Sequence, residues 1–409
     1  MEIRKLTSYE ELLESAKVIA TAFMHPWIEK EAKEEARRQA EGQVQGAEAW
    51  GLFSKNGKMI ASVSTQLHVL AFGGQKVLAG ELHMVGSLPE GRGSGNVRSL
   101  VKTILEDYRD RGCTFSLLIP FSYSFYRKFG FEVASGYLEQ RVPIDQLANI
   151  PCPYEVTQLQ REDEISRLRS FADAFASSRN MAEIKGDEHW RWNGNGDYGE
   201  PNFMHAECPR YTYLLEDSDG KLHAFLRFLF THEPSNPFVG ELIVDELVYD
   251  SPQSLLGALG FLYGMRAKVS HISLNIPDDI DLGTILPECG KIERTKGGHV
   301  MARLLDVRRA LSLMPHPLEE GQYALRVTDK FMPQNSGVYQ VNFTSEGTQV
   351  IKTCDQTASC DLELTEETLV MLVIGVIGLD EALYRPNTCL HGNELLLRKV
   401  FRTRAVCLR

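Results

Sequence analysis

The chain has 409 residues, of which 43% are apolar and 24% charged, enough for two or three hydrophobic cores of ordinary size. Its net charge of −11 argues against nucleic acid as a partner, because that binding depends on Lys and Arg at the phosphates, and it favours cationic partners. No apolar run approaches the roughly 20 residues of a membrane span, and the acidic, amphipathic N-terminal segment is unlike a signal peptide. We therefore expect a cytoplasmic protein that does not bind membranes.

The first 90 residues predict two helices followed by antiparallel strands. From Tyr9 to Phe23 the apolar residues recur at helical spacing, and a strongly charged helix is expected from Glu29 to Gln45. A turn with Asn56-Gly57 then separates two apolar runs and indicates a hairpin. The expected strands cover residues 49–53, 59–70 and 76–85.

The stretch from Met84 to Arg98 reads MVGSLPEGRGSGNVR, an apolar strand end and a glycine-rich turn followed at once by a helix expected over residues 94–111. A turn of small residues lets consecutive backbone N–H groups point the same way, and the helix start adds unpaired donors and a positive dipole end. The guanidinium of Arg92 is placed to reach a phosphate. This order predicts a phosphate-binding turn, and an ordinary strand-to-helix turn is the alternative.

A second motif lies one strand and helix downstream. Residues 115–119 predict a short buried strand, the aromatic run FYRKFGF covers residues 125–131, and a closing strand is expected over residues 131–142. Together with this run, Arg92-Gly93-Ser94-Gly95 resembles the R/Q-x-x-G-x-G/A pyrophosphate loop of the GNAT acyl-CoA N-acetyltransferases. The larger Val97 at the last small position is similar to the loop of one subgroup, the enhanced-intracellular-survival (Eis-like) acetyltransferases.

The resemblance implies a site for acetyl-CoA, which is a co-substrate in that family. There, a bulge in the strand before the loop bonds the pantetheine arm, and the loop's N–H groups bind the pyrophosphate. By this likeness the expected cofactor-binding residues are Val85, Ser87, Arg92, Gly93, Gly95 and Asn96. The thioester is then expected where the strands over residues 84–88 and 115–119 splay apart.

The implied chemistry needs an acid and a base. Tyr126 has a phenol that is protonated at neutral pH and can donate a proton to the departing thiolate, although the ring could instead pack its helix on the sheet, and Tyr123 is the other candidate. For the base, the resemblance implies the C-terminal carboxylate, carried here by Arg409 where the subgroup usually ends in an aromatic residue. Glu81 and His83, on one face of the strand before the loop, are rivals, as is water.

The middle of the chain repeats this plan. Three short motifs recur in the same order at an offset of about 160 residues, namely the hairpin turn at residues 214–221, GEL at residues 240–242 and SLNIP at residues 273–277. At this offset Pro252 stands opposite Arg92 and Leu255 opposite Gly95, so the repeat lacks the arginine and the glycines. We expect a degenerate copy that binds no cofactor.

The last hundred residues read as a small α+β domain. Strands are predicted over residues 323–327, 337–343, 349–353 and 358–362, followed by an apolar helix over residues 368–377 that is capped from Thr365. The segment resembles the sterol-carrier-protein-like domain that closes the same subgroup, including a D-x-x-x-P-x-N turn from Asp329 to Asn335. The helix is expected to be core, and a lipid cavity is the alternative.

The predicted architecture is α/β and α+β: two GNAT folds in tandem, each a mixed β-sheet flanked by helices, and a C-terminal sterol-carrier-protein-like domain. The expected domains are residues 1–150 (catalytic), 151–300 (degenerate copy) and 301–409 (sterol-carrier-like). The eight cysteines are scattered without zinc spacing, so no metal site is predicted.

The predicted function is acetyl transfer from acetyl-CoA directly to a primary amine of a cationic acceptor. The acceptor classes are an aminoglycoside-like molecule, a polyamine or the lysine side chain of a peptide. A non-catalytic acyl-CoA sensor and a lipid-binding carrier are the alternatives. The resemblance also implies a closed homo-oligomer, often a hexamer.

Overall fold

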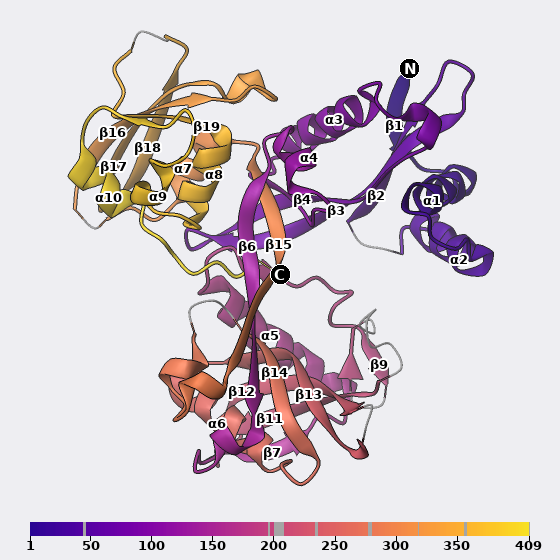
Figure 1. Ribbon diagram of the computed structural model, residues 1–409, viewed down its shortest axis with the longest axis vertical. Helices are drawn as coiled ribbons and strands as arrows, with labels where there is room; N and C mark the ends of the chain where they lie inside the picture. The colour runs from indigo at the N-terminus through magenta and orange to yellow at the C-terminus, as the bar shows by residue number, and fades with distance from the viewer. Residues whose placement is uncertain are drawn as a thin grey trace. The chain divides into compact units, whose positions relative to one another are not determined.

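The computed structural model describes the chain except residues 44–45, 195–196, 200–207, 234–235, 277–279, 318, 356–357 and 409. The described residues form two compact units, whose elements are labelled in Figure 1. The first unit contains Met1–Ser135 and His299–Arg404 with Leu408, and the second contains Gly136–Gly298 and Ala405–Cys407. No helix in the described ranges is long and apolar enough to span a bilayer. The three-domain division at residues 150 and 300 stays a prediction.

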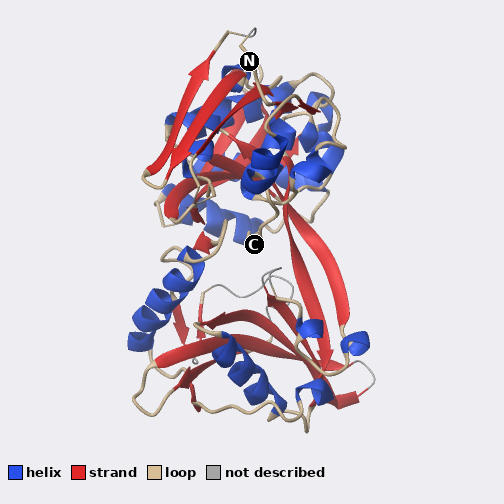
Figure 2. Cartoon of the chain, turned by 90° about the vertical axis from the view of Figure 1, so that its left-hand side faces the viewer, coloured by secondary structure: helices blue, strands red, loops and turns tan. Residues whose placement is uncertain are grey.

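The N-terminal part of the first unit is a mixed sheet with helices on both faces (Figures 1 and 2). Its elements are β1 (Glu2–Leu6), α1 (Tyr9–Phe23), α2 (Glu29–Ala40), β2 (Ala47–Phe53), β3 (Met59–Phe72), β4 (Gln75–Ser87), α3 (Asn96–Asp110), β5 (Phe115–Leu118) and α4 (Tyr123–Arg127). The strands lie in the order β1-β2-β3-β4-β5, and only β4 and β5 are parallel. Along β2, Trp50 and Leu52 pack with α3, whereas Ala49 and Phe53 pack with α1, because alternate side chains point to opposite faces.

The neighbour of β5 in this sheet comes from much later in the chain. The end of β15 (Glu293–Leu304) pairs antiparallel with β5, from Met301 opposite Leu118 to Leu304 opposite Phe115. The strand predicted over residues 131–142 is present as β6 (Glu132–Pro143), but its last six residues pair with β14 (Val269–Ile276) in the second unit. The predicted strand is therefore present, but its partners could not be predicted, because spacing along the chain does not determine which distant strand pairs with it.

The C-terminal part of the first unit is a five-stranded sheet in the order β18-β17-β16-β19-β20, with β16 and β19 parallel. Its elements are α7 (Val307–Leu313), β16 (Gly321–Thr328), β17 (Gly337–Thr344), β18 (Gly347–Thr353), β19 (Leu362–Thr365), α8 (Glu366–Ile374), α9 (Leu379–Ala382), β20 (Cys389–Leu390) and α10 (Glu394–Val400). The strand predicted over residues 358–362 begins later than expected, at Leu362, as β19. The apolar helix α8 is core, as predicted, since every residue from Thr368 to Ile374 is buried.

A buried ion cluster joins the two parts of the first unit. The guanidinium of Arg303, on β15, is fully buried, donates to the backbone carbonyl of Phe129 and pairs with the carboxylate of Asp329. Asn335 Nδ2 also donates to this carboxylate at 3.1 Å. Through Arg303, the turn from Asp329 to Asn335 in the C-terminal part therefore contacts the segment that follows α4 in the N-terminal part.

The second unit repeats the strand–helix order of the first sheet. Its elements are β7 (Glu155–Gln158), α5 (Ile165–Ser177), β8 (Glu183–Ile184), β9 (Trp192–Gly194), β10 (Asp197–Tyr198), β11 (Arg210–Glu216), β12 (Leu222–Glu233), β13 (Asn236–Tyr249), α6 (Pro252–Tyr263) and β14. Strands β11, β12 and β13 are antiparallel neighbours, α6 follows, and β14 is parallel to β13. The same relations hold for β2, β3, β4, α3 and β5, which supports the predicted duplication.

Candidate active site

Strand β4 carries a bulge just before the predicted turn. Its register with β3 shifts between Ser62 and Ser64, so that Met84 and Val85 together oppose one residue. Met84 has a φ of 43°, a backbone conformation that side chains rarely adopt. The pairing of β4 with β5 ends at Leu82, so β4 continues past its parallel neighbour. Both features lie where the resemblance expects the pantetheine arm.

The turn after β4 leads directly into α3 and leaves the start of this helix open. Gly93 and Gly95 both have a φ of 79°, and a side chain built on either would meet nothing within 4 Å. Ser94 Oγ and Asn96 Nδ2 each donate to the carbonyl of Gly91 at 2.9 Å, which fixes the turn. No side chain caps α3 in the described structure. The first N–H groups of α3 are therefore available to an anion.

A cavity of about 690 Å³ lies over this turn. It is lined by Ala22, Phe23, Val85, Ser87, Gly91, Arg92, Gly93, Gly95, Asn96, Val97, Arg98, Phe121, Phe125, Lys128 and Phe129. All six predicted cofactor-binding residues belong to this lining. The charged residues among the described lining are Arg92, Arg98 and Lys128, with no acid, in a chain whose net charge is −11. The cavity thus combines an uncapped helix start with local positive charge, which suits a phosphate-bearing ligand.

Arg92 bridges the elements that surround the turn. Its Nε donates to the carbonyl of Ser87 at 3.4 Å and its Nη2 to the carbonyl of Ala22 at 3.3 Å. These bonds connect the end of β4 with the end of α1, although the residue is largely exposed. The guanidinium has five N–H donors, so the remaining ones can contact a phosphate.

Tyr126 lies in α4 and is 3% exposed. Its ring packs edge-on against Phe125, with centroids 5.1 Å apart, and against Phe121 at 5.4 Å. Burial raises the pKa of the phenol to about 12, so the hydroxyl stays protonated at neutral pH. Tyr126 is absent from the described cavity lining, but its neighbour Phe125 and the next aromatic residue, Phe129, belong to it. The structure therefore places a protonated phenol behind one wall of the cavity.

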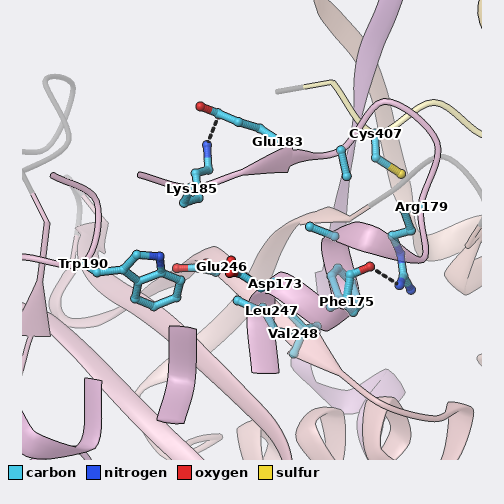
Figure 3. Close-up of a pocket in the computed structure, with 13 residues that line it drawn as sticks. Asp173, Phe175, Arg179, Glu183, Lys185, Trp190, Glu246, Leu247, Val248 and Cys407 are labelled. Carbon is cyan, nitrogen blue, oxygen red and sulfur yellow. Dashed lines mark hydrogen bonds and ion pairs between the residues drawn. The ribbon is translucent and has the colours of Figure 1, made fainter. Parts of the chain in front are cut away.

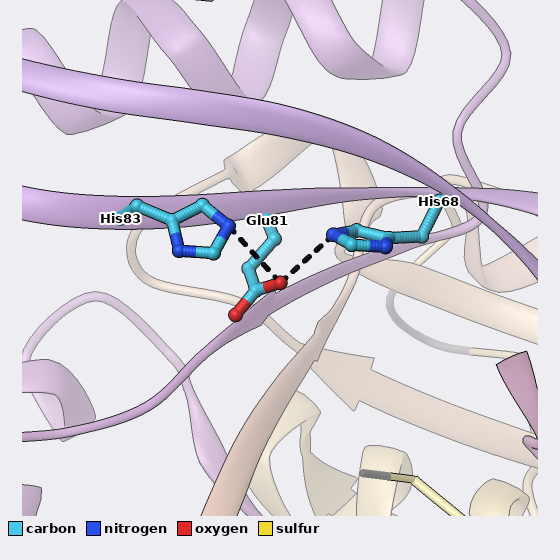
Figure 4. A group of neighbouring side chains, drawn as sticks. All are labelled: His68, Glu81 and His83. Carbon is cyan, nitrogen blue, oxygen red and sulfur yellow. Dashed lines mark ion pairs between the residues drawn. The ribbon is translucent and has the colours of Figure 1, made fainter. Parts of the chain in front are cut away.

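The rival bases Glu81 and His83 lie side by side, and a third residue joins them (Figure 4). Glu81 Oε2 is 2.8 Å from His68 Nε2 and 3.2 Å from His83 Nε2. Burial acts to raise the pKa of Glu81, but contacts with the two imidazoles and their positive charge outweigh burial and hold that pKa at about 2. Glu81 is therefore a carboxylate at neutral pH.

The remaining candidate base, Arg409, lies outside the described residues. Leu408, which precedes it, is 4% exposed and groups with the first unit. The proposed role of the terminal carboxylate thus stays a prediction.

The start of α6, the counterpart of α3, offers no comparable anion site. Ser251 caps this helix by accepting from the backbone N–H of Ser254 at 3.2 Å, and Ser254 Oγ accepts from the N–H of Ser251. The carboxylate of Asp250 accepts from the Ser254 hydroxyl and pairs with His223 at 2.9 Å. Side chains and a negative charge therefore occupy the helix start, as the missing arginine and glycines predict.

The second unit contains a smaller cavity of about 100 Å³ (Figure 3). Trp190, Arg179 and Glu246 contribute to its lining. Burial acts to raise the pKa of Glu246, but His189, Arg227 and a hydrogen bond from Tyr198 outweigh it and hold the pKa at about 2. Because small-molecule sites usually enclose at least about 300 Å³, this cavity is a poor substrate site.

Comparison with family models identifies two domains. Residues 2–134 match the model of the acetyltransferase (GNAT) domain, and residues 307–384 match that of the sterol carrier protein domain. Residues 2–134 are a GNAT acetyltransferase domain. The predicted fold class is thereby confirmed, and the acetyltransferase domain makes this chain an N-acetyltransferase. GNAT acetyltransferases use acetyl-CoA and act on small-molecule or peptide acceptors.

Solved structures show the same fold over almost the whole chain. A GCN5-related N-acetyltransferase from Anabaena variabilis is 17% identical, with a TM-score of 0.81 over 98% of this chain and 97% of that one. A GCN5-related N-acetyltransferase from Kribbella flavida is 19% identical, with a TM-score of 0.79 over 99% of this chain and 97% of that one. Eis1 from Mycobacterium abscessus is 18% identical, with a TM-score of 0.76 over 100% of this chain and 99% of that one. No curated protein sequence matches the chain.

Sequence reasoning missed several residues of the candidate site. Arg98 and Lys128 add two positive charges to the cavity, and Phe121 adds an aromatic wall. Its position gave a signal for Arg98, which lies near the start of the predicted helix. No local signal marked His68, because strand pairing brings it to Glu81 from 13 positions earlier in the chain.

Proposed function

We propose that the acetyltransferase domain transfers an acetyl group from acetyl-CoA directly to a primary amine of a cationic acceptor. The observation that carries this proposal is the cavity over the uncapped start of α3, with its three cations and no acid in the described lining. Val85, Ser87, Arg92, Gly93, Gly95 and Asn96 are the proposed binding residues. Their backbone and side-chain donors suit a pyrophosphate, and the apolar rings beside them suit the pantetheine arm.

The proposed reaction needs no acyl-enzyme. The amine nitrogen attacks the thioester carbonyl carbon, the carbon–sulfur bond breaks, and Tyr126 donates its phenolic proton to the departing sulfur. A pKa near 12 keeps this proton on the phenol until the thiolate forms. The proton lost by the amine passes to a base, for which the Arg409 carboxylate, the Glu81–His83 pair and water are the candidates.

The cationic class of the acceptor rests on the charge of the chain. A net charge of −11 attracts amines over a long range, while the positive charges at the cavity are local to the proposed phosphate site. Aminoglycoside-like molecules, polyamines and lysine side chains share this chemistry. We also propose that the protein belongs to the Eis-like subgroup and is cytoplasmic. We further propose a closed homo-oligomer such as a hexamer, and mass photometry of the full chain tests this oligomeric state.

Thiol release from acetyl-CoA tests the function. The full chain is incubated with acetyl-CoA and a panel of polyamines, aminoglycosides and lysine peptides, using wild type, Tyr126→Phe and the matched control Tyr123→Phe from the same helix. Release that depends on a cationic amine and is lost only in Tyr126→Phe supports the proposal. Tight CoA binding without release from any amine favours an acyl-CoA sensor, and lipid uptake with weak CoA binding favours a carrier.

A further inference from the structure

Three potential metal ligands converge on the acetyltransferase sheet without any motif in the sequence. They belong to His68 on β3 and, on β4, to Glu81 and His83, and one ligand atom of each residue lies within 4.8 Å of the other two. Figure 4 shows the two imidazoles reaching the same carboxylate oxygen from opposite sides. The sequence predicted no metal site because it contains no ligands at close spacing along the chain. Ligands that are brought together by strand pairing are not detected in this way.

The ligand types match a known class of site. Two imidazoles and one carboxylate hold zinc in sites that keep a further position open, and the same set binds other first-row divalent ions. Tetrahedral ligands at zinc bond lengths of about 2.0–2.1 Å lie about 3.3 Å apart. The 3.2 Å separation of His83 Nε2 from Glu81 Oε2 already has this value, and the 2.8 Å separation for His68 needs about half an ångström more.

The backbone holds these side chains in place. Ser64 pairs with His83, and Gln66 with Glu81, in an unbroken stretch of the β3–β4 ladder that continues to His68. The phenol of Tyr108 donates to the Glu81 carbonyl at 2.8 Å from beneath the sheet. Side-chain exposures of 13% for Glu81, 14% for His68 and 38% for His83 show that the group is largely buried, with the His83 side chain the most exposed.

We propose that His68, Glu81 and His83 form a binding site for one divalent cation of the zinc class. An ion at this site bonds the Nε2 atoms of neutral imidazoles and the Glu81 carboxylate, so its affinity should fall as the pH is lowered. Because Glu81 and His83 are also candidate bases, a bound ion occupies groups beside the proposed reaction centre.

Titration with Co²⁺ and Zn²⁺ tests the site on the full chain after treatment with a chelator. Visible absorption of bound Co²⁺ reports its ligands, and competition with a chromophoric chelator gives the Zn²⁺ affinity. We expect one ion per chain in wild type and a loss of affinity of more than 100-fold in His83→Ala, since even residues outside the ligand shell cost about 10–100-fold. The milder His83→Gln and Glu81→Gln keep the test valid if His83→Ala does not fold.

A second group supplies the matched control. Glu363 on β19, with Cys360 and His391 in the segments beside β19 and β20, also places ligand atoms within 4.8 Å, but His391 is exposed. The double variant Cys360→Ser/His391→Ala should bind the ion as wild type does. Binding that is absent in wild type, unchanged in the His83 variants, or lost only in the double variant would overturn the proposal.

Discussion

Replacing Arg92 by alanine tests the phosphate-binding turn most directly. A hydrogen bond between a charged donor and a ligand contributes about 1.5–3 kcal/mol. Arg92 is exposed, and two of its donors already contact the carbonyls of Ser87 and Ala22, so the lower limit applies. A loss of about 1.5 kcal/mol corresponds to roughly tenfold weaker CoA binding.

Calorimetry with two ligands separates a phosphate contact from a structural role. CoA carries the pyrophosphate, whereas S-acetylpantetheine lacks it. Arg92→Ala should weaken CoA about tenfold and leave S-acetylpantetheine unchanged, and added salt should reduce the difference. Lys102→Ala is the control, because Lys102 lies on α3, the helix that follows the turn, with 48% side-chain exposure and does not line the cavity.

Two outcomes would refute this reasoning. Equal weakening of both ligands would mean that Arg92 acts only by joining α1 to β4. Unchanged binding of CoA would mean that its phosphates lie elsewhere.

Three further predictions concern the acid, the buried ion pair and a titrating histidine. Tyr126→Phe should lower kcat for thiol release by about 10²–10⁴-fold, while Tyr123→Phe should stay near wild type. Because the pKa of Tyr126 is about 12, the wild-type rate should not fall between pH 8 and 10 when the acceptor amine is neutral over that whole range. Asp329→Ala removes the closer of two buried carboxyl groups beside Arg303 and leaves Glu366 at 3.7 Å, so urea unfolding should show a loss of about 1–3 kcal/mol, and a loss near zero contradicts the ion pair. Burial lowers the pKa of His316 from 6.5 to about 4, so the unfolded chain binds more protons in this window and the free energy of unfolding should fall as pH drops from 6.5 to 4. His316→Gln should remove that part of the pH dependence in urea titrations at several pH values, and an unchanged slope argues against it.

Features set within a few residues could be predicted from the sequence. Helix α1 begins and ends at the predicted Tyr9 and Phe23, and α3 begins within two residues of its predicted start. The six residues predicted for acetyl-CoA all line one cavity. That these residues lie together could be predicted because the turn, the helix start and the bulge all lie between Met84 and Asn96, where backbone geometry follows from neighbouring residues.

Features that depend on distant pairing could not be predicted. The strand beside β5 is β15, about 180 positions later, and β6 pairs with β14. The alternation of apolar residues along a strand looks the same whichever strand pairs with it. This pattern therefore does not identify the partner of β5 or of β6.

The sequence by itself determined the glycine-rich turn before α3, the different residues at the start of α6 and the aromatic helix that contains Tyr126. Only the tertiary structure decided how deeply Tyr126 is buried, which strands close the sheets, and that His68 meets Glu81 and His83. The physical reason is the range of the interactions. A turn and a helix start are built from hydrogen bonds between near neighbours, whereas burial and the His68–Glu81–His83 group arise from strand pairing and packing between segments far apart in the chain.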